Sequence, residues 1–139
     1  MIVIVRLIYQ VFFIIDSMGE NLLKNKIILI TGATSGIGKE TAIGLARLDA
    51  TIIFTTRDNL KGEKTKKELI TTTNNKNIHM LKCDLASFES IRNFCKEFKS
   101  KYDKLHVLIN NAGVWDFNRH ISKDGIENIL QLIILLRFS

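Results

Sequence analysis

Three glycines stand in the spacing Gly-x-x-x-Gly-x-Gly between an apolar run and a segment of helical periodicity. Gly32, Gly36 and Gly38 follow the β-branched stretch Ile27 to Thr31. The periodic positions after them are Ile37, Thr41, Leu45 and Leu48. Glycine permits positive φ and lets a phosphate approach the free N–H groups at a helix N-terminus. The pattern predicts a strand, a tight turn and a helix that bind a diphosphate.

The pair Gly38-Lys39 also invites comparison with a P-loop. That loop needs glycine five residues before the glycine of the Gly-Lys pair, and Ser or Thr directly after the lysine. Those positions hold Ala33 and Glu40. The sequence therefore excludes a P-loop, and it offers no correctly placed ligand for the metal that accompanies one.

Polar residues follow three further predicted strands. Arg57 comes after Ala50 to Thr56, Asp84 after Ile78 to Lys82, and Asn110 after Leu105 to Ile109. The carboxyl ends of parallel strands meet at one edge of a sheet, and ligands bind there where the strand order reverses. We expect these residues and the glycine turn to line one crevice.

Strands that alternate with helices predict an α/β fold, a doubly wound parallel sheet of Rossmann type, incomplete, with about four strands in the order 3-2-1-4. The expected domain covers residues 24–139, after an apolar segment and connection over residues 1–23. Asp58 or Asn59 caps a lysine-rich helix from about Leu60 to Thr71, and Thr72 to Asn77 form a loop. Ser87 caps a helix with a buried stripe at Ile91, Phe94, Cys95 and Phe98.

The strand Leu105 to Ile109 is almost wholly apolar, as expected for a parallel strand covered on both faces. The loop Val114 to Ser122 leads to an apolar helix predicted over Lys123 to Leu136. No strand is expected beyond it, so the fourth strand keeps an open edge. The apolar helix is then a candidate for self-association.

The motifs resemble those of the short-chain dehydrogenase/reductase family. Its signature Thr-Gly-x-x-x-Gly-Ile-Gly is matched by Thr31 to Gly38, and further likeness lies at Asp84-Leu85 and at Asn110 to Gly113, over roughly Lys24 to Leu130. The residues of these motifs are similar to those of the retinol-dehydrogenase-like and WW-domain-oxidoreductase-like branch. The resemblance implies hydride transfer between a nicotinamide cofactor and an alcohol or carbonyl, here a lipophilic one such as a retinoid or steroid-like compound. It implies cofactor contacts from Gly32, Thr34, Ser35, Gly36, Ile37, Gly38, Arg57, Asp84, Leu85, Asn110, Ala112 and Gly113.

Arg57 favours NADP over NAD. NAD binders place an acid at the end of the second strand to accept from the ribose 2′-hydroxyl, whereas an arginine accommodates the 2′-phosphate of NADP. The strand here ends Thr55-Thr56-Arg57, with no acid before the arginine. Asp58, the next residue, leaves NAD as the alternative.

The family's catalytic residues are absent from these 139 residues. The family pairs a tyrosine with a lysine as Tyr-x-x-x-Lys, whereas Tyr9 and Tyr102 are followed at that spacing by Phe13 and His106. Ile133 stands where the branch shows a helical asparagine. We therefore predict no catalytic residue in a chain that resembles the cofactor-binding half of an oxidoreductase, truncated. The alternative is a non-catalytic nucleotide-binding or partner-binding protein.

Charge and cysteine content argue against two other functions, nucleic-acid binding and metal binding. The net charge is +6, but the lysines are interleaved with acids and no aromatic residues alternate with them, so nucleic-acid binding is not predicted. Cys83 and Cys95 lack metal-ligand spacing, and we expect two buried, reduced thiols and no metal site. Reduced thiols suit the cytoplasm or a cytosol-facing surface.

The run Met1 to Ile15 is apolar apart from Arg6 and Gln10. It is shorter than the roughly 20 residues of a membrane-spanning helix, and it lacks the basic start of a signal peptide. Three interpretations stay open: an uncleaved membrane anchor or interfacial segment, an element packed on the domain, or upstream sequence outside the working protein. An anchor would place the domain on the cytosolic side of a membrane such as the endoplasmic reticulum.

Overall fold

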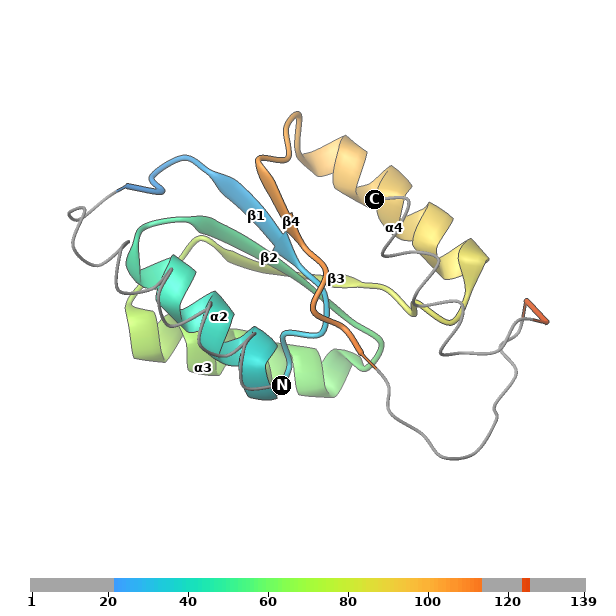
Figure 1. Ribbon diagram of the computed structural model, residues 1–139, viewed down its shortest axis with the longest axis horizontal. Coiled ribbons are helices and arrows are strands. Elements are labelled where there is room, and N and C mark those ends of the chain that lie inside the picture. Colours follow the sequence, from blue (N-terminus) through green and yellow to red (C-terminus); the bar gives the residue numbers. More distant parts are fainter. Residues whose placement is uncertain (1–21, 114–123, 126–139) are drawn as a thin grey trace, which may run out of the picture.

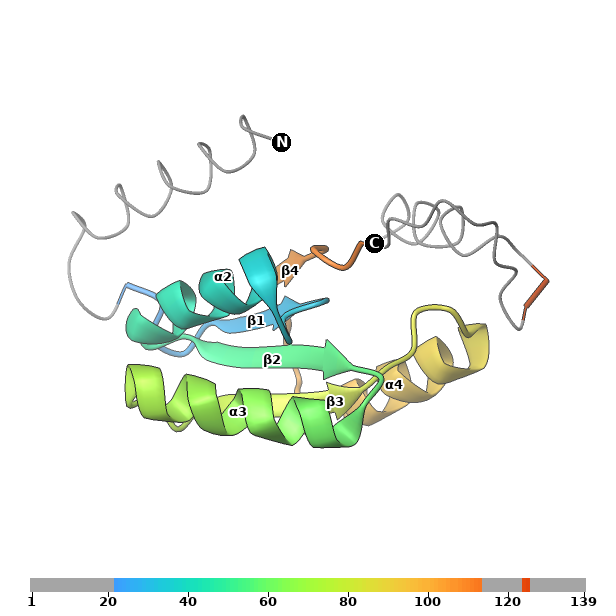
Figure 2. The ribbon, with the colours of Figure 1, turned by 90° about the horizontal axis from the view of Figure 1, so that it is seen from below.

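The computed structural model describes residues 22–113 and 124–125. Within them, parallel strands form a sheet in the order β3-β2-β1-β4, which confirms the predicted doubly wound topology. The strands are β1 (Ile27–Ile30), β2 (Thr51–Thr56), β3 (Ile78–Lys82) and β4 (Val107–Ile109), and the helices are α2 (Gly36–Arg47), α3 (Asn59–Thr73) and α4 (Phe88–Lys101). Helices α2 and α3 cover one face of the sheet and α4 the other (Figures 1 and 2).

The central strand β1 supplies side chains to both faces, because successive residues of a strand point in opposite directions. Ile28 and Ile30 belong to the cluster under α2 and α3, with Phe54 of β2 and Leu69 of α3. Leu29 points to the other face, into a smaller cluster that also contains Ile53, Leu81 and Phe98. Burial on both sides explains why β1 and β2 read as continuous apolar runs.

Two of the helices begin at the predicted caps. The Asp58 carboxylate accepts a hydrogen bond from the Lys61 amide at 3.1 Å, and the Ser87 hydroxyl accepts one from the Ser90 amide at 3.3 Å. Helix α3 runs slightly further than expected and ends at Thr73, and the residue that caps its C-terminus is Asn74, whose φ is +56°. Each cap satisfies an N–H group that has no partner within its helix, and so fixes where the chain enters the helix.

Two predictions about burial, on β4 and on α4, are wrong. Strand β4 is shorter than expected and is not covered on both faces, since Val107 is 42% and Leu108 36% exposed. Of the predicted buried stripe on α4, only Phe98 is buried, and Cys95 is an exposed thiol. Val107 and Leu108 point to opposite faces of the sheet, and both are exposed because, among the described elements, β4 packs closely only against β1.

Three sequence predictions lie outside the described residues. They are the apolar segment Met1 to Ile15, the loop Val114 to Ser122, and the helix Lys123 to Leu136, of which the structure describes Asp124 and Gly125. Among the helices that the structure describes, none is long and apolar enough to cross a membrane.

Candidate functional site

The turn between β1 and α2 needs glycine at two positions for different reasons. Gly32 has φ +68°, and a Cβ there would lie 2.7 Å from Cα of Ala112, so the backbone after β4 packs directly against it. Gly36 has φ +56°, but a Cβ there would meet no atom within 4 Å. The left-handed conformation therefore explains glycine at position 36, and it leaves open space in front of the turn.

That open space lies at the N-terminus of α2. Ser35 is the residue before the helix, its side chain makes no capping hydrogen bond, and no acidic residue occupies the first turn. The first N–H groups of a helix lack intrahelical acceptors and carry its positive dipole end. Ser35, Gly36 and Ile37 are exposed, whereas Thr34 is half-buried and Gly38 is buried. The start of α2 therefore presents N–H groups without a side-chain cap, next to open space.

Asn111 holds the turn in place from the end of β4. Its side-chain amide donates to the carbonyls of Thr31 at 3.1 Å and Gly32 at 3.0 Å. A Cβ on Gly38 would collide with this amide and would lie 2.5 Å from the Gly32 carbonyl oxygen. Gly38 is thus required by close packing, because the helix start, the turn and Asn111 meet at one point.

Asn111 was not among the predicted site residues. It lies within the motif Asn110 to Gly113, and the available signal was its place directly after a strand that pairs with β1. A polar side chain at that position reaches the backbone of the adjacent glycine turn. The resemblance implied that Asn110 to Gly113 line the adenine ribose and steady the sheet, and the structure gives Asn111 the second kind of role, because it holds the turn.

Arg57 follows β2 and is exposed. Its neighbour Asp58 is engaged twice: its carboxylate caps α3, and its main-chain carbonyl accepts from the Thr56 hydroxyl at 2.8 Å. Among the described residues, no hydrogen bond or ion pair joins Arg57 to the other predicted site residues. The structure therefore leaves the guanidinium exposed to solvent or a ligand, while one oxygen of the neighbouring carboxylate caps α3.

Asp84 and Leu85 follow β3. The Asp84 carboxylate accepts from the Ala86 amide at 3.0 Å, and the Asp84 amide donates to the Ser90 hydroxyl at 2.9 Å. Asp84 was expected to bind adenine or to cap the next helix; it forms a local turn, and Ser87 is the cap. Leu85 is half-buried beside this turn.

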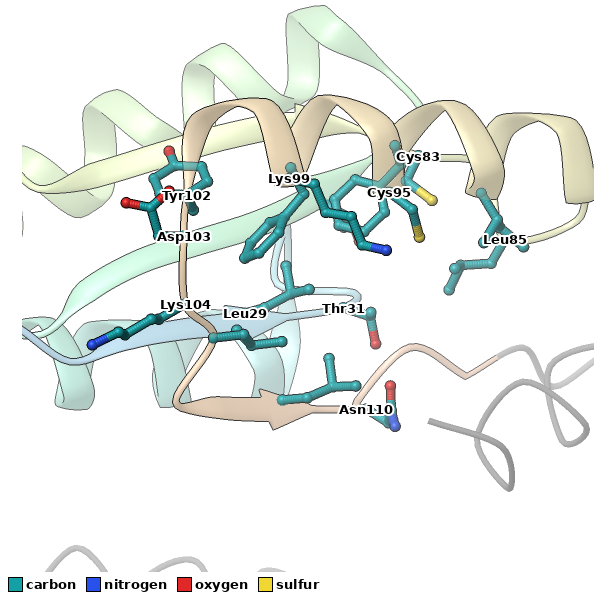
Figure 3. A pocket seen from close by; sticks show the side chains of 16 residues that line it. Leu29, Thr31, Cys83, Leu85, Cys95, Lys99, Tyr102, Asp103, Lys104 and Asn110 are labelled. Carbon is teal, nitrogen blue, oxygen red and sulfur yellow. The ribbon is translucent and has the colours of Figure 1, made fainter.

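A cavity of about 480 Å³ lies between α4 and the sheet, next to the carboxyl ends of the strands. Its walls are mostly apolar, and Thr31, Leu85 and Asn110 lie together at one end (Figure 3). Burial of the Cys83 thiol in its wall raises the pKa of this group to about 12. The structure thus brings β1, β3 and β4 residues of the predicted crevice to one place, and Gly113 continues the β4 loop with open space around its Cα.

Within residues 22–113 and 124–125, no three His, Cys, Asp or Glu side chains are grouped so that they could hold a metal ion.

Comparison with known proteins gives consistent matches. Residues 26–135 match the sequence model of the family described as short chain dehydrogenase. Human retinol dehydrogenase 11 is 46% identical over 105 residues, which are 76% of this chain and 33% of that protein. Human polyprenol dehydrogenase is 40% identical over 114 residues, 82% of this chain and 34% of that protein. The chain therefore spans about one third of the length of these relatives.

A solved structure with the same fold is the Pseudomonas aeruginosa RhlG/NADP active-site complex. It superposes with a TM-score of 0.69 at 27% sequence identity, over 84% of this chain and 45% of the other. The same fold therefore occurs in a protein whose structure was solved with NADP.

Proposed function

The chain belongs to the short-chain dehydrogenase family of oxidoreductases, and we propose that it binds NADP(H) at the β1–α2 turn as the cofactor-binding part of such an enzyme. The observation that carries this proposal is the open turn at Gly36, with an α2 N-terminus that has no side-chain cap and no acid in its first turn. A diphosphate fits this site because it accepts hydrogen bonds from the free N–H groups and its charge is stabilised by the helix dipole.

The contacts of the rest of the cofactor follow from the strand order. In our proposal Gly32 to Gly38 hold the diphosphate, Asp84 and Leu85 contact the adenine, and Asn110, Ala112 and Gly113 line its ribose. These segments come from β1, β3 and β4, whose carboxyl ends share one edge of the sheet. Asn111 positions the turn and contacts no ligand directly.

The choice of NADP rests on Arg57 and Asp58. The Arg57 guanidinium is exposed and can donate two hydrogen bonds to a 2′-phosphate. The Asp58 carboxylate accepts from the Lys61 amide at the start of α3 through one of its two oxygens. The exposed Arg57 guanidinium favours NADP, and the second Asp58 oxygen keeps NAD as the alternative.

The proposed reaction is hydride transfer between NADP(H) and a lipophilic alcohol or carbonyl compound. The cofactor supplies the hydride, and the residues of this chain bind and orient it. Two relatives carry names of dehydrogenases for lipophilic alcohols, retinol and polyprenol, and this supports the substrate class.

Calorimetric titration of the purified chain with NADPH and NADH tests the cofactor proposal. Arg57→Glu should weaken NADPH binding by about 10- to 100-fold, the value of a lost charge-assisted hydrogen bond, and should change NADH binding far less. Arg92→Glu on α4 makes the same charge change at another exposed arginine and should bind NADPH like the unsubstituted chain. Equal NADPH binding by both variants would contradict the contact with Arg57.

A second candidate is nucleotide binding without catalysis, because the 139 residues contain no Tyr-x-x-x-Lys pair. Both candidates predict binding without NADPH oxidation by this chain alone, so the endogenous protein distinguishes them. A Ser and a Tyr-x-x-x-Lys pair encoded beyond residue 139 support an oxidoreductase, whereas an intact endogenous mass of 15.9 kDa supports the second candidate.

We also propose that Met1 to Ile15 attaches the chain to a membrane, with the domain on the cytosolic side. The support is the apolar composition of this segment, which can insert its side chains at the bilayer surface. Sedimentation with phosphatidylcholine vesicles tests it: the full chain should sediment with them, and a chain that starts at Met18 should stay in the supernatant.

A further inference from the structure

Exposed basic side chains gather at the amino edge of the sheet, where the parallel strands begin, opposite the proposed cofactor site. In Figure 2 this edge lies at the left, away from the tips of the strand arrows. Lysines stand shortly before β1, β3 and β4, and an arginine ends α2 shortly before β2. We call this set the basic edge, and its members are all exposed: Lys24, Lys26, Arg47, Lys76 and Lys104.

The charges of the basic edge are not neutralised by ion pairs within the described residues. The ion pairs that these residues form lie within α4 and between α2 and α3, and neither involves a member of the basic edge. The described acids at this edge outside the ion pairs are Asp49 and Asp103. The basic edge therefore keeps a surplus of positive charge.

Helix dipoles account for one of these charges. A basic residue in the last turn of a helix is stabilised by the negative end of the helix dipole, and Arg47 has this position in α2. Lys24, Lys26, Lys76 and Lys104 lie outside the helices, so the dipole does not explain them. Their shared feature is their place at one edge of the sheet, where they suit an anionic partner.

The basic edge is small enough to touch one flat surface. Neighbouring strands lie about 4.8 Å apart, so β3 and β4 at the two sides of the sheet are about 14 Å apart. Leu22 and Leu105 are 42% and 40% exposed at the same edge. Lysine side chains beside exposed leucines suit the surface of a bilayer, where charged headgroups meet the apolar acyl region. The cytoplasmic leaflet also carries anionic lipids.

A nucleic acid fits this edge less well. Proteins that bind single strands stack the bases on aromatic side chains between their basic residues. Tyr102, at the end of α4, packs against the rings of Phe98 and His79 instead. The exposed side chains beside the lysines are aliphatic, as a lipid surface requires.

The chain before the described residues limits how far this edge can lie from a membrane. The Leu23 amide donates to the Leu48 carbonyl at 3.2 Å, which places the first described residues at the amino edge. The apolar run Met1 to Ile15 ends seven residues before Leu22. Seven residues span at most about 25 Å. A bilayer that holds this run therefore lies close to the basic edge.

We propose that the basic edge docks the domain on an anionic membrane surface, with its lysines and arginine against acidic lipid headgroups. The inference rests on the proposed attachment of Met1 to Ile15 and deepens it, because it assigns a second membrane contact to the folded domain. Docking by this edge turns the β1–α2 turn, at the other end of β1, away from the headgroups. The negatively charged cofactor then binds at a distance from negatively charged lipid.

Sedimentation of the full chain with two kinds of vesicle tests the docking. One kind contains phosphatidylcholine alone, and the other, called mixed vesicles below, contains equal amounts of phosphatidylcholine and phosphatidylserine. Each basic residue near an anionic surface contributes about fivefold to partitioning, so the chain should bind mixed vesicles at least about tenfold more tightly. Salt screens exposed charges, and the difference should shrink as sodium chloride is added.

Two double variants make the same charge change at opposite edges of the sheet. Lys76→Glu with Lys104→Glu changes lysines of the basic edge that lie far from Met1 to Ile15 in the sequence. Lys61→Glu with Lys82→Glu changes exposed lysines at the start of α3 and the end of β3. The first variant should bind mixed vesicles at least about tenfold more weakly than the second, and both should bind phosphatidylcholine alone like the unsubstituted chain.

Circular dichroism shows whether the variants fold. If glutamate unfolds the first variant, Lys76→Gln with Lys104→Gln replaces it, and Lys61→Gln with Lys82→Gln becomes the control. Equal binding of the two edge variants to mixed vesicles would overturn the docking.

The failure of the docking differs from the failure of the attachment. Equal binding of the unsubstituted chain to both kinds of vesicle would reject the docking and keep the attachment of Met1 to Ile15. Binding to mixed vesicles alone would support the docking and contradict the attachment, and binding to neither would reject both. Binding of a single-stranded RNA oligonucleotide that Lys76→Glu with Lys104→Glu abolishes, without any gain from phosphatidylserine, would overturn the docking in favour of nucleic acid.

Discussion

Thr31 and Asn111 hold each other at the carboxyl ends of β1 and β4. The Thr31 hydroxyl accepts hydrogen bonds from the amides of Asn111 at 3.1 Å and Ala112 at 3.0 Å, while the Asn111 side chain donates to the Thr31 carbonyl at 3.1 Å. These bonds join residues about 80 positions apart in the sequence. They fix the β4 loop against the glycine turn, and so they determine the shape of the proposed cofactor site.

Thr31→Val should destabilise the domain. Valine keeps the shape of the side chain but leaves two partly buried amides without their acceptor, at a cost of about 1 to 3 kcal/mol in the free energy of unfolding. Urea unfolding followed by circular dichroism measures this change. Thr41→Val removes an exposed hydroxyl bonded to the Ile37 carbonyl and should have a much smaller effect. Equal stability of the two variants would show that the Thr31 bonds contribute little.

Gly38→Ala should lower both stability and NADPH affinity. The added methyl group would collide with the Asn111 amide and the Gly32 carbonyl, so the turn must shift, at a cost of about 1 to 3 kcal/mol for overpacking. Gly113→Ala adds the same methyl group where no atom lies within 4 Å, and its unfolding curve should be unchanged. An unchanged unfolding curve for Gly38→Ala would mean that the Asn111 side chain can move aside at little cost in free energy.

Lys39→Met should leave NADPH affinity within about twofold of the unsubstituted chain, because the Lys39 ammonium is engaged with Glu68 of α3 in a partly exposed ion pair, whose loss changes stability little. The Lys39 ammonium is paired with the Glu68 carboxylate of α3, a contact that lowers the pKa of Glu68. It is therefore directed toward α3, unlike the lysine of a P-loop. Calorimetric titration measures the affinity, and a loss of tenfold or more would place the lysine on the phosphates. Glu68→Gln is the matching control for the ion pair.

The stability of the chain should fall in alkaline solution through Cys83. Burial raises the pKa of this thiol from 9.0 to about 12. The unfolded state therefore releases the proton from about pH 9 while the folded state retains it. The contribution of Cys83 to the free energy of unfolding is fully present below about pH 9. It is lost as the pH rises toward 12, by at most about 1.4 kcal/mol per pH unit.

Urea unfolding of variants at about pH 8, 9 and 10 isolates the contribution of Cys83 to the pH dependence of stability. Cys83→Ala should have a shallower pH dependence than the unsubstituted chain, whatever its absolute stability. Cys95→Ala removes the exposed thiol and should keep the original slope. Parallel slopes in all three proteins would contradict the assigned titration.

Local signals were sufficient for most of the fold. Hydrophobic runs located β1, β2 and β3, side-chain caps located the starts of α3 and α4 at Asp58 and Ser87, and alternation of strands and helices predicted the order of the sheet. These features depend on neighbours in the sequence and on general rules of chain connection. They failed at β4 and on α4, where burial depends on what packs from elsewhere, and so Cys95 was wrongly expected to be buried.

By itself, the sequence determined that a glycine turn joins a buried strand to a helix, because positive φ and helical periodicity are properties of single residues and their near neighbours. Only the tertiary structure showed why Gly32 and Gly38 in that turn admit no side chain: Ala112 and Asn111 pack against them from β4. It also showed that one oxygen of Asp58 caps α3, while no such hydrogen bond is formed by the exposed Arg57 among the described residues. Such contacts join segments distant in the chain, and their distances are set by packing of the whole sheet.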